Sequence, residues 1–193
     1  MRKLIIGEFV TLDGVIQAPG GAEEDTDGGF AYGGWTQAYW HDDLGAYFVN
    51  TMKDCDTFIL GRKTWQGHGA VFDALPAGDM FGDIMNGMRK YVVSTTLKSA
   101  DLWRNSSIIS KNVPEEVQKI KEQPGKNIYL DGSSVLAHTL IQNDLVDGFN
   151  LLVYPLILGS GKKLFPDGAR HNLKLVESRA FPTGVVLTRY ERA

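Results

Sequence analysis

The sequence predicts an α/β protein whose mixed, mostly parallel sheet carries helices on both faces and ends in a β-hairpin. Short apolar runs typical of buried strands recur along the chain. Segments with helical spacing lie between them, and strands that alternate with helices favour parallel pairing. Residues 173–177 and 185–190 resemble two further strands around the turn Pro182-Thr183-Gly184. The 193 residues fit one domain, residues 1–193, with no linker or low-complexity tail.

The first third of the chain predicts a strand, a long loop, a helix and a second strand. The strand covers residues 3–12 and ends at the turn dipeptide Asp13-Gly14. Residues 19–35, rich in glycine and aspartate, predict an unusually long loop, and such loops often act as active-site lids. A flexible excursion without a role is the alternative. Residues 42–52 have helical spacing, and residues 57–60 form the next strand.

The remaining elements continue this alternation as far as the hairpin. Apolar residues three or four apart predict the helices, and short apolar runs predict the strands. In order, we expect a helix at residues 79–88, strands at 91–94 and 107–110, a helix at 115–122, a strand at 128–130, a helix at 133–142 and a strand at 149–158.

Composition excludes several classes of function. The net charge is −3 and no basic stripe suits nucleic acid, because Lys162-Lys163 is an isolated pair of the kind usually found on a solvated face. No apolar stretch approaches the ~18 residues of a membrane span, and no secretory signal is visible. The single cysteine, Cys55, lies between two aspartates that disfavour its thiolate. The four histidines are far apart in sequence, so we expect no metal site, and we expect a cytoplasmic protein.

One local pattern occurs twice and is the main functional signal. A short apolar run reaches Gly61 and continues as Arg62-Lys63-Thr64, and a second reaches Gly132 and continues as Ser133-Ser134. A strand that delivers a glycine to a helix start leaves unpaired N–H groups in the positive field of the helix dipole, which suits phosphate. Two such turns on one sheet suit an extended, multiply phosphorylated ligand such as a dinucleotide. For either turn alone, a simple helix cap is the alternative.

The glycine segment 158–163 does not match two familiar phosphate motifs. A phosphate loop needs glycine at position 156 and serine or threonine at position 163, where the chain has Leu156 and Lys163. The dinucleotide fingerprint needs a third glycine and a following helix, and Leu164-Phe165-Pro166 offers neither. Ser133 lies in no nucleophile elbow, so nothing here indicates hydrolysis.

Several segments carry a family resemblance that runs from about residue 3 to the C-terminus. They are Thr11-Leu-Asp-Gly14, Gly33-Gly-Trp35, Leu60-Gly-Arg-Lys-Thr-Trp65, Tyr91-Val-Val-Ser94, Leu145-Val-Asp-Gly148 and the segment from Val153 to Phe165. Together they resemble the bacterial dihydrofolate reductase-like family, in its riboflavin-biosynthesis reductase branch, as a stand-alone member. The segment around Gly61 is shared with dihydrofolate reductases proper, whereas the pattern Pro-x-x-Leu-Gly-x-Gly-x-x-Leu-Phe indicates the riboflavin-reductase branch.

The resemblance implies an NADPH-binding fold of the dihydrofolate reductase type and a homodimer. The first glycine turn then supplies Gly61, Arg62, Lys63 and Thr64 to phosphates, and the second closes on the pyrophosphate. The end of the strand at 91–94 matches the family's position for the adenosine phosphate, although many relatives carry a basic residue where Thr95 stands. The implied cofactor-binding residues outside the first turn are Ser94, Thr95, Thr96, Gly132, Ser133, Ser134 and Val135.

Catalytic and substrate-binding residues are less well marked. In dihydrofolate reductases a carboxylate on the first helix polarises the pterin, and Asp43 stands near the matching place with a two-residue offset before Gly61. Asp13 stands beside the expected nicotinamide. Each has a plain alternative, Asp43 as an acid stabilising a helix N-terminus and Asp13 as a turn former. Trp35, Tyr39 and Trp40 are candidates to line a pocket for a flat heterocycle, or else core aromatics.

We therefore expect an NADPH-dependent reductase of a small heterocyclic, pteridine- or pyrimidine-like, or carbonyl substrate, similar to 5-amino-6-(5-phosphoribosylamino)uracil reductase. Three alternatives stay open. A true dihydrofolate reductase needs its helix carboxylate in register. A riboflavin-pathway reductase needs a basic patch for the phosphoribosyl group, and it usually accompanies a zinc deaminase domain that this chain lacks. A non-catalytic nucleotide-binding module would keep only the cofactor cleft.

Overall fold

The computed structural model describes residues 1–193 and is built on one eight-stranded sheet with strand order β4-β3-β2-β5-β1-β6-β8-β7. All pairs from β4 to β6 are parallel, and β6-β8 and β8-β7 are antiparallel. The strands are β1 (Leu4–Thr11), β2 (Cys55–Gly61), β3 (Arg89–Val93), β4 (Ser106–Ile109), β5 (Asn127–Asp131), β6 (Gly148–Tyr154), β7 (Leu173–Ala180) and β8 (Val186–Arg192). The α/β architecture with its terminal hairpin is confirmed.

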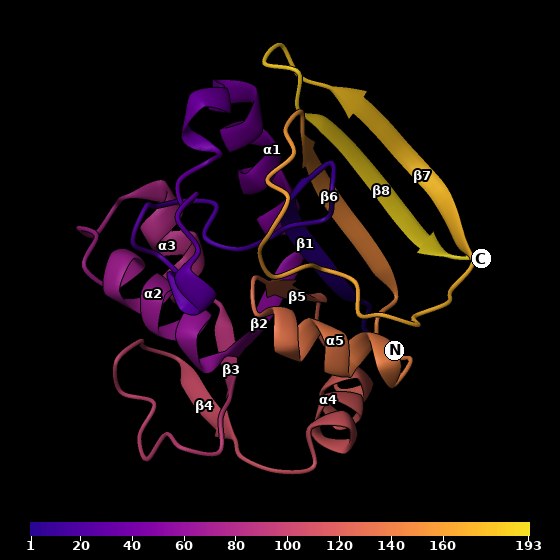
Figure 1. Ribbon diagram of the computed structural model, residues 1–193. Coiled ribbons are helices and arrows are strands. Elements are labelled where there is room, and N and C mark those ends of the chain that lie inside the picture. The colour runs from indigo at the N-terminus through magenta and orange to yellow at the C-terminus, as the bar shows by residue number, and fades with distance from the viewer.

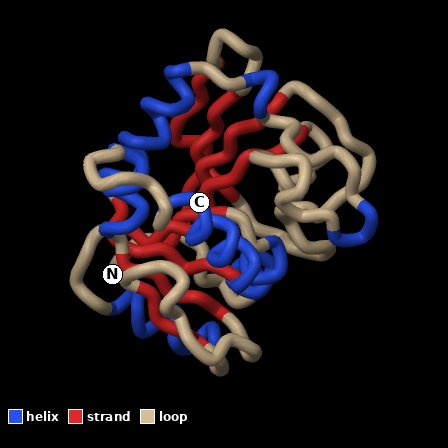
Figure 2. The backbone as a smooth tube through the Cα atoms, turned by 90° about the vertical axis from the view of Figure 1, so that its left-hand side faces the viewer, coloured by secondary structure: helices blue, strands red, loops and turns tan.

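Helices cover both faces of the sheet, as predicted. They are α1 (Asp42–Lys53), α2 (Arg62–Phe72), α3 (Met80–Gly87), α4 (Val113–Glu122) and α5 (Ser134–Gln142). The two faces use alternate residues of each strand: Ile59 of β2 joins a core with α4 and α5, while Phe58 and Leu60 join a core with α1, α2 and α3. Figure 1 labels these two helix groups, and Figure 2 shows the strands in red between helices in blue.

The predicted elements lie where expected, with one clear difference in length. The strand predicted at residues 149–158 ends at Tyr154 in the structure. Pro155 follows, and proline has no N–H to donate to a neighbouring strand, so the apolar residues 156–158 continue as a loop. The residues after Gly61 form α2, the helix that the glycine pattern requires.

The long loop between β1 and α1 contains only two short 3-10 turns, Asp27–Gly29 and Gln37–Tyr39. It is nevertheless anchored, because Trp35 Nε1 donates to the carbonyl of Gln17 at 2.8 Å. Its first residues also pair with the glycine segment, since Ile16 N donates to Lys162 O at 2.9 Å. The glycine segment 158–163 therefore supports the loop.

The carboxyl ends of the parallel strands bring both glycine turns to one edge of the sheet. β2 and β5 are neighbours, with Phe58 opposite Tyr129, so the turns at Gly61 and Gly132 leave the sheet side by side. β5 ends opposite Gly7, while β1 continues to Thr11 along β6. In open α/β sheets, ligands bind at such crevices beyond the strand ends.

Candidate functional site

The two glycine turns touch each other through Ser133. Its Oγ accepts a hydrogen bond from Gly61 N at 2.7 Å and donates one to Thr64 Oγ1 at 2.9 Å. Gly132 has φ +66°, and a Cβ there would lie 2.9 Å from Thr64 Cγ2. Both the conformation and the close approach require glycine at this position. The repeated pattern thus forms one structure.

Both helix N-termini at these turns lack a side-chain cap. The residue preceding α2 is Gly61, and the residue preceding α5 is Ser133, whose hydroxyl bonds to the other turn instead of to its own helix. The simple-cap alternative therefore does not describe either turn. Unpaired N–H groups at two adjacent helix starts are suited to bind anions.

A cleft of about 210 Å³ lies between the turns and carries positive charge. Arg62 and Lys63 enter it from α2 and Lys162 enters from the glycine segment 158–163, against the single carboxylate of Asp25. Its lining residues are Asp25, Gly61, Arg62, Lys63, Thr64, Ser133, Ser134, Val135, Leu136 and Lys162. Seven residues expected to bind the cofactor thus line one cleft: Gly61, Arg62, Lys63, Thr64, Ser133, Ser134 and Val135.

Two aspartates of the long loop hold the lysines at this cleft. Asp27 Oδ2 lies 2.5 Å from Lys63 Nζ and 2.8 Å from Lys162 Nζ, and Asp25 Oδ2 lies 2.5 Å from Lys162 Nζ. The hydrogen bonds from Lys162 and Lys63 lower the pKa of Asp27 to about 2. The loop therefore supplies carboxylates that pair with two of the cationic side chains lining the cleft.

Lys162 is a cleft residue that sequence reasoning missed. The interpretation of Lys162-Lys163 as a solvated pair is wrong for Lys162, because its backbone pairs with the loop and its side chain lies in the cleft. Lys163 is exposed and has no ion pair. The available signal was the position of Lys162 immediately after a glycine turn.

Ser94, Thr95 and Thr96 follow β3 beside the first glycine turn, because Gly61 pairs with Val93. Ser94 is buried, and its Oγ accepts hydrogen bonds from Thr96 N at 3.2 Å and Leu97 N at 3.1 Å. Thr95 and Thr96 are exposed. Ser94 thus shapes the turn, and the two threonines are open to a ligand at the same edge.

The carboxylate of Asp13 connects the end of β1 to the glycine segment 158–163 through hydrogen bonds. Its carboxylate accepts from Thr11 Oγ1 at 2.5 Å, Gly159 N at 2.8 Å and Leu158 N at 3.2 Å. The bond from Thr11, together with the two backbone donors, lowers the pKa of Asp13. This geometry favours the turn-forming alternative for Asp13.

Asp43 lies in the first turn of α1, and its side chain is 48% exposed. Its Oδ2 lies 3.7 Å from both His41 Nδ1 and Arg179 Nη2. Asp43 is not among the residues that line the cleft. The structure places it beside the terminal hairpin, where it also stabilises the N-terminus of α1.

The three aromatic candidates separate into two groups. Trp35 and Tyr39 pack edge-on against Tyr154, with ring centroids 5.2 and 5.7 Å apart, and Trp35 is buried. Trp40 is 59% exposed and lies against Gly45. Trp35 and Tyr39 therefore belong to an aromatic cluster between the long loop and β6, and Trp40 lies outside it.

Three ionisable side chains at the same sheet edge were not predicted. His68 Nε2 of α2 lies 3.1 Å from Asp131 Oδ2 at the end of β5. Glu8 of β1 is 5% exposed, and its Oε1 is buried without a partner. Burial, and then the charge of Asp131, raise the pKa of Glu8 well above its usual value. No spacing along the chain marks this group, since its members come from three separate elements.

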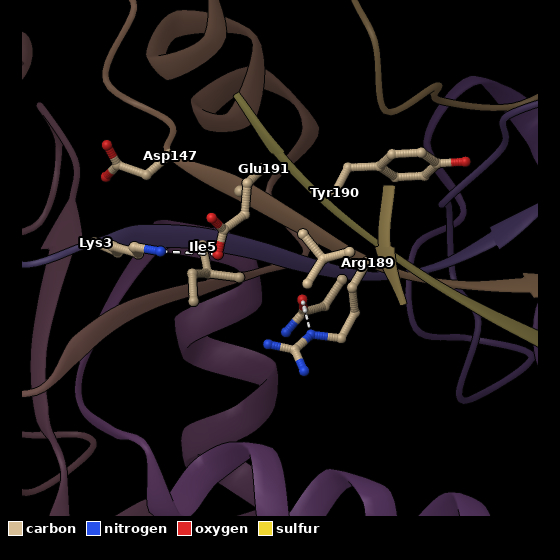
Figure 3. Close-up of a pocket in the computed structure, with 9 residues that line it drawn as sticks. Lys3, Ile5, Asp147, Arg189, Tyr190 and Glu191 are labelled. Carbon is tan, nitrogen blue, oxygen red and sulfur yellow. Dashed lines mark hydrogen bonds and ion pairs between the residues drawn. The ribbon is translucent and has the colours of Figure 1, made fainter. Parts of the chain in front are cut away.

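A second depression, on the face of β1, β6 and β8, is a poor ligand site. Its volume is about 10 Å³, roughly the space of one water molecule. Figure 3 shows Lys3 directed at Glu191, and Lys3 Nζ lies 2.8 Å from Glu191 Oε1. Arg189 Nε donates to Asn150 Oδ1 at 3.3 Å. The charged side chains that line it therefore already have partners within the protein, since Asp147 pairs with Lys121.

Comparison with known proteins agrees with this architecture. The model of the family "RibD C-terminal domain" matches residues 2–187. The uncharacterized protein YyaP of Bacillus subtilis is 34% identical over 189 residues, covering 96% of this chain and 92% of that protein. No helix of the present structure has the length and apolar character needed to cross a membrane.

Two solved structures share the fold. A putative riboflavin biosynthesis protein from Shewanella sp. PV-4 superposes with a TM-score of 0.74 at 19% identity, covering 99% of both chains. A dihydrofolate reductase from Enterococcus faecalis, solved in complex with NADP(H), superposes with a TM-score of 0.61 at 17% identity, covering 98% of this chain and 96% of that one. At these identities the likeness establishes the dihydrofolate reductase-like fold.

Proposed function

The chain belongs to the RibD C-terminal domain family, and we propose that it is an NADPH-dependent reductase of a small, flat heterocyclic or carbonyl substrate. One observation carries the proposal: two uncapped helix N-termini open side by side into a single cleft with three cationic side chains. That donor set fits a ligand with several phosphates, because backbone N–H groups and basic side chains both bind phosphate oxygens.

Different residues of the cleft would bind different parts of NADPH. Arg62, Lys63 and the N–H groups at the start of α2 would bind phosphate at the first turn. Ser134 and the N–H groups at the start of α5 would bind the pyrophosphate at the second. The exposed Thr95 and Thr96 would meet the adenosine phosphate. When bound, the reduced nicotinamide supplies a hydride to the substrate.

Substitution of Lys162 tests whether NADPH binds in this cleft, and substitution of the neighbouring Lys163 is the control. We expect Lys162→Ala to weaken NADPH binding about tenfold or more, since a hydrogen bond to a charged group contributes roughly 1.5–3 kcal/mol. Lys163→Ala, one residue further and without an ion pair, should bind as the wild type does. Quenching of tryptophan fluorescence during an NADPH titration measures both.

The cofactor assignment is wrong if the wild type shows no quenching up to millimolar NADPH. Equal effects of the two lysine variants would show that the cleft contributes only general positive charge. Oxidation of NADPH with dihydrofolate, a pyrimidinone or an aromatic aldehyde then separates a reductase from a protein that only binds the cofactor.

A further inference from the structure

His68 and Asp131 form a histidine–carboxylate pair directly beside the glycine turns. Thr64 and His68 are four residues apart on α2, so they lie on the same side of the helix in successive turns. Thr64 bonds to Ser133 and approaches Gly132, and His68 Nε2 lies 3.1 Å from Asp131 Oδ2. One face of α2 thus contacts three consecutive residues of the second turn.

The pair is accessible, unlike most groups under the sheet edge. The side chains of His68 and Asp131 are 23% and 25% exposed. The side-chain atoms that are buried without a partner are Glu8 Oε1, Tyr47 Oη and Thr183 Oγ1. Nδ1 of His68 has no hydrogen-bond partner in the protein. One ring nitrogen is held by Asp131 and the other is free to serve a ligand.

The surroundings favour a charged imidazolium. Burial opposes the charge on His68, but the hydrogen bond and charge of Asp131, with a smaller effect from Glu24 of the long loop, outweigh it and raise its pKa. The charge of Asp131 also acts on Glu8 of β1, whose pKa is raised first by burial and then by that charge. The rings of Phe72 and Trp103 contact the imidazole edge-on at 5.5 and 6.2 Å and limit its orientation.

We propose that His68 is the proton donor of the reduction and that Asp131 is the residue that positions it; this rests on the reductase function proposed above. A hydride adds to the carbon of a C=N or C=O group, and the electron pair of the broken π bond takes the proton from His68 Nδ1. A new C–H bond and a new N–H or O–H bond result. His68 is left neutral, with Nε2–H still on Asp131, and regains its proton from water.

The two carboxylates expected from sequence are less suited to this role. Asp13 accepts three hydrogen bonds within the protein, and Asp43 lies near Arg179 beside the terminal hairpin. His68 follows the cleft-lining Thr64 by one helical turn and is held by Asp131, the residue before Gly132. The proposal requires the nicotinamide to extend from the second turn past Asp131, where His68 would meet the reacting atoms.

A conservative variant of His68 shows whether this residue donates a proton or only holds α2 to Asp131 through its hydrogen bond. His68→Gln keeps an amide donor for Asp131 but cannot deliver a proton. We expect it to bind NADPH within about threefold of wild type and to lose about 10²–10⁴ in kcat, tested with the fastest of dihydrofolate, a pyrimidinone and an aromatic aldehyde. His171→Gln is the matched control and should retain full turnover. His171 Nδ1 lies 3.6 Å from Asp144, which follows the C-terminal end of α5, whereas the cleft is lined by residues at the N-terminus of α5.

The pH profile tests the role of Asp131. Because His68 must be protonated, wild-type kcat falls as pH rises through its raised pKa. In Asp131→Asn the carboxylate that raises this pKa is gone, so the fall should begin at lower pH. A His68→Gln enzyme with wild-type kcat, or an unchanged profile in Asp131→Asn, overturns the proposal. Failure of the wild type to bind NADPH instead overturns the proposed function.

If the enzyme reduces none of dihydrofolate, the pyrimidinone and the aromatic aldehyde, nuclear magnetic resonance of the four histidines tests the role of His68 without turnover. In ¹H–¹⁵N spectra we expect His68 to titrate above its usual pKa in the wild type and lower in Asp131→Asn. Addition of NADP⁺ should shift the signals of His68 and leave those of His171 unchanged. A His68 signal that does not respond to NADP⁺ overturns the proposal, since a proton donor must lie beside the nicotinamide.

Discussion

The glycine turns that line the cleft and the His68–Asp131 pair beside them are built in different ways. Each turn is a contiguous stretch in which a strand, a glycine and a helix start follow one another along the chain. In the pair, His68 and Asp131 are 63 residues apart and meet only because β2 and β5 are neighbours. The proposed binding of phosphate would therefore depend on local backbone geometry, whereas the proposed proton transfer would depend on the packing of α2 against β5.

The largest effect on NADPH affinity should come from adding a side chain at Gly132 in the second glycine turn. Gly132→Val places a β-branched residue at φ +66° and a Cβ 2.9 Å from Thr64. We expect NADPH affinity to fall at least 100-fold and the protein to lose about 2–4 kcal/mol of stability, measured by titration and by urea unfolding.

Gly168→Val is the control for strain alone, because Gly168 has φ +79° and a Cβ at this position would meet nothing within 4 Å. It should lose stability without losing NADPH affinity. If both variants bind NADPH equally well, the second turn does not contact the cofactor, and the contrast between the glycine turns and the His68–Asp131 pair disappears.

A smaller effect, of opposite sign, should follow from removing a competitor of phosphate. Asp27 pairs with Lys63 and Lys162, so a bound phosphate must replace its carboxylate. Asp27→Asn should bind NADPH about three- to tenfold more tightly at low salt, and the gain should shrink as salt screens the charges. Asp167→Asn, outside the cleft, controls for net charge. Weaker binding by Asp27→Asn would mean that the ion pairs organise the site instead of competing for it.

The smallest effect concerns stability beside the His68–Asp131 pair. Glu8 has a raised pKa in the folded protein, chiefly because it is buried and then because of the charge of Asp131. A carboxyl group of this kind stabilises fully below its unfolded pKa near 4.5, and that contribution is lost as pH rises toward its folded value. Glu8→Gln should therefore match the wild type at low pH and exceed it in free energy of unfolding at pH 8.

Urea unfolding at several pH values measures this difference, and other titrating groups cancel between the two proteins. A difference between Glu8→Gln and the wild type that does not change from pH 5 to pH 8 would show that Glu8 ionises normally. The charge balance around Asp131 would then differ from the one described.

The fold and the two glycine turns could be predicted from the sequence because both depend on patterns among neighbouring residues in the chain. Alternating strand and helix patterns indicate the sheet. The two glycine turns touch because β2 and β5 are neighbours, which only the structure shows. Lys162 was missed, because its side chain enters the cleft only through the pairing of its backbone with the loop at Ile16. His68 was also missed, since one histidine on a helix carries no signal until the carboxylate that faces it is known. The assigned roles of Asp43 and Asp13 stay predictions that variants can test.

The most direct measurement is a crystal structure with NADPH bound. We predict that phosphate groups of one molecule contact the N-termini of both α2 and α5, with Lys63 and Lys162 released from Asp27 toward them. The nicotinamide should then lie beside His68. NADPH that contacts only one of the two turns, or that binds elsewhere on the molecule, would contradict the proposed cleft.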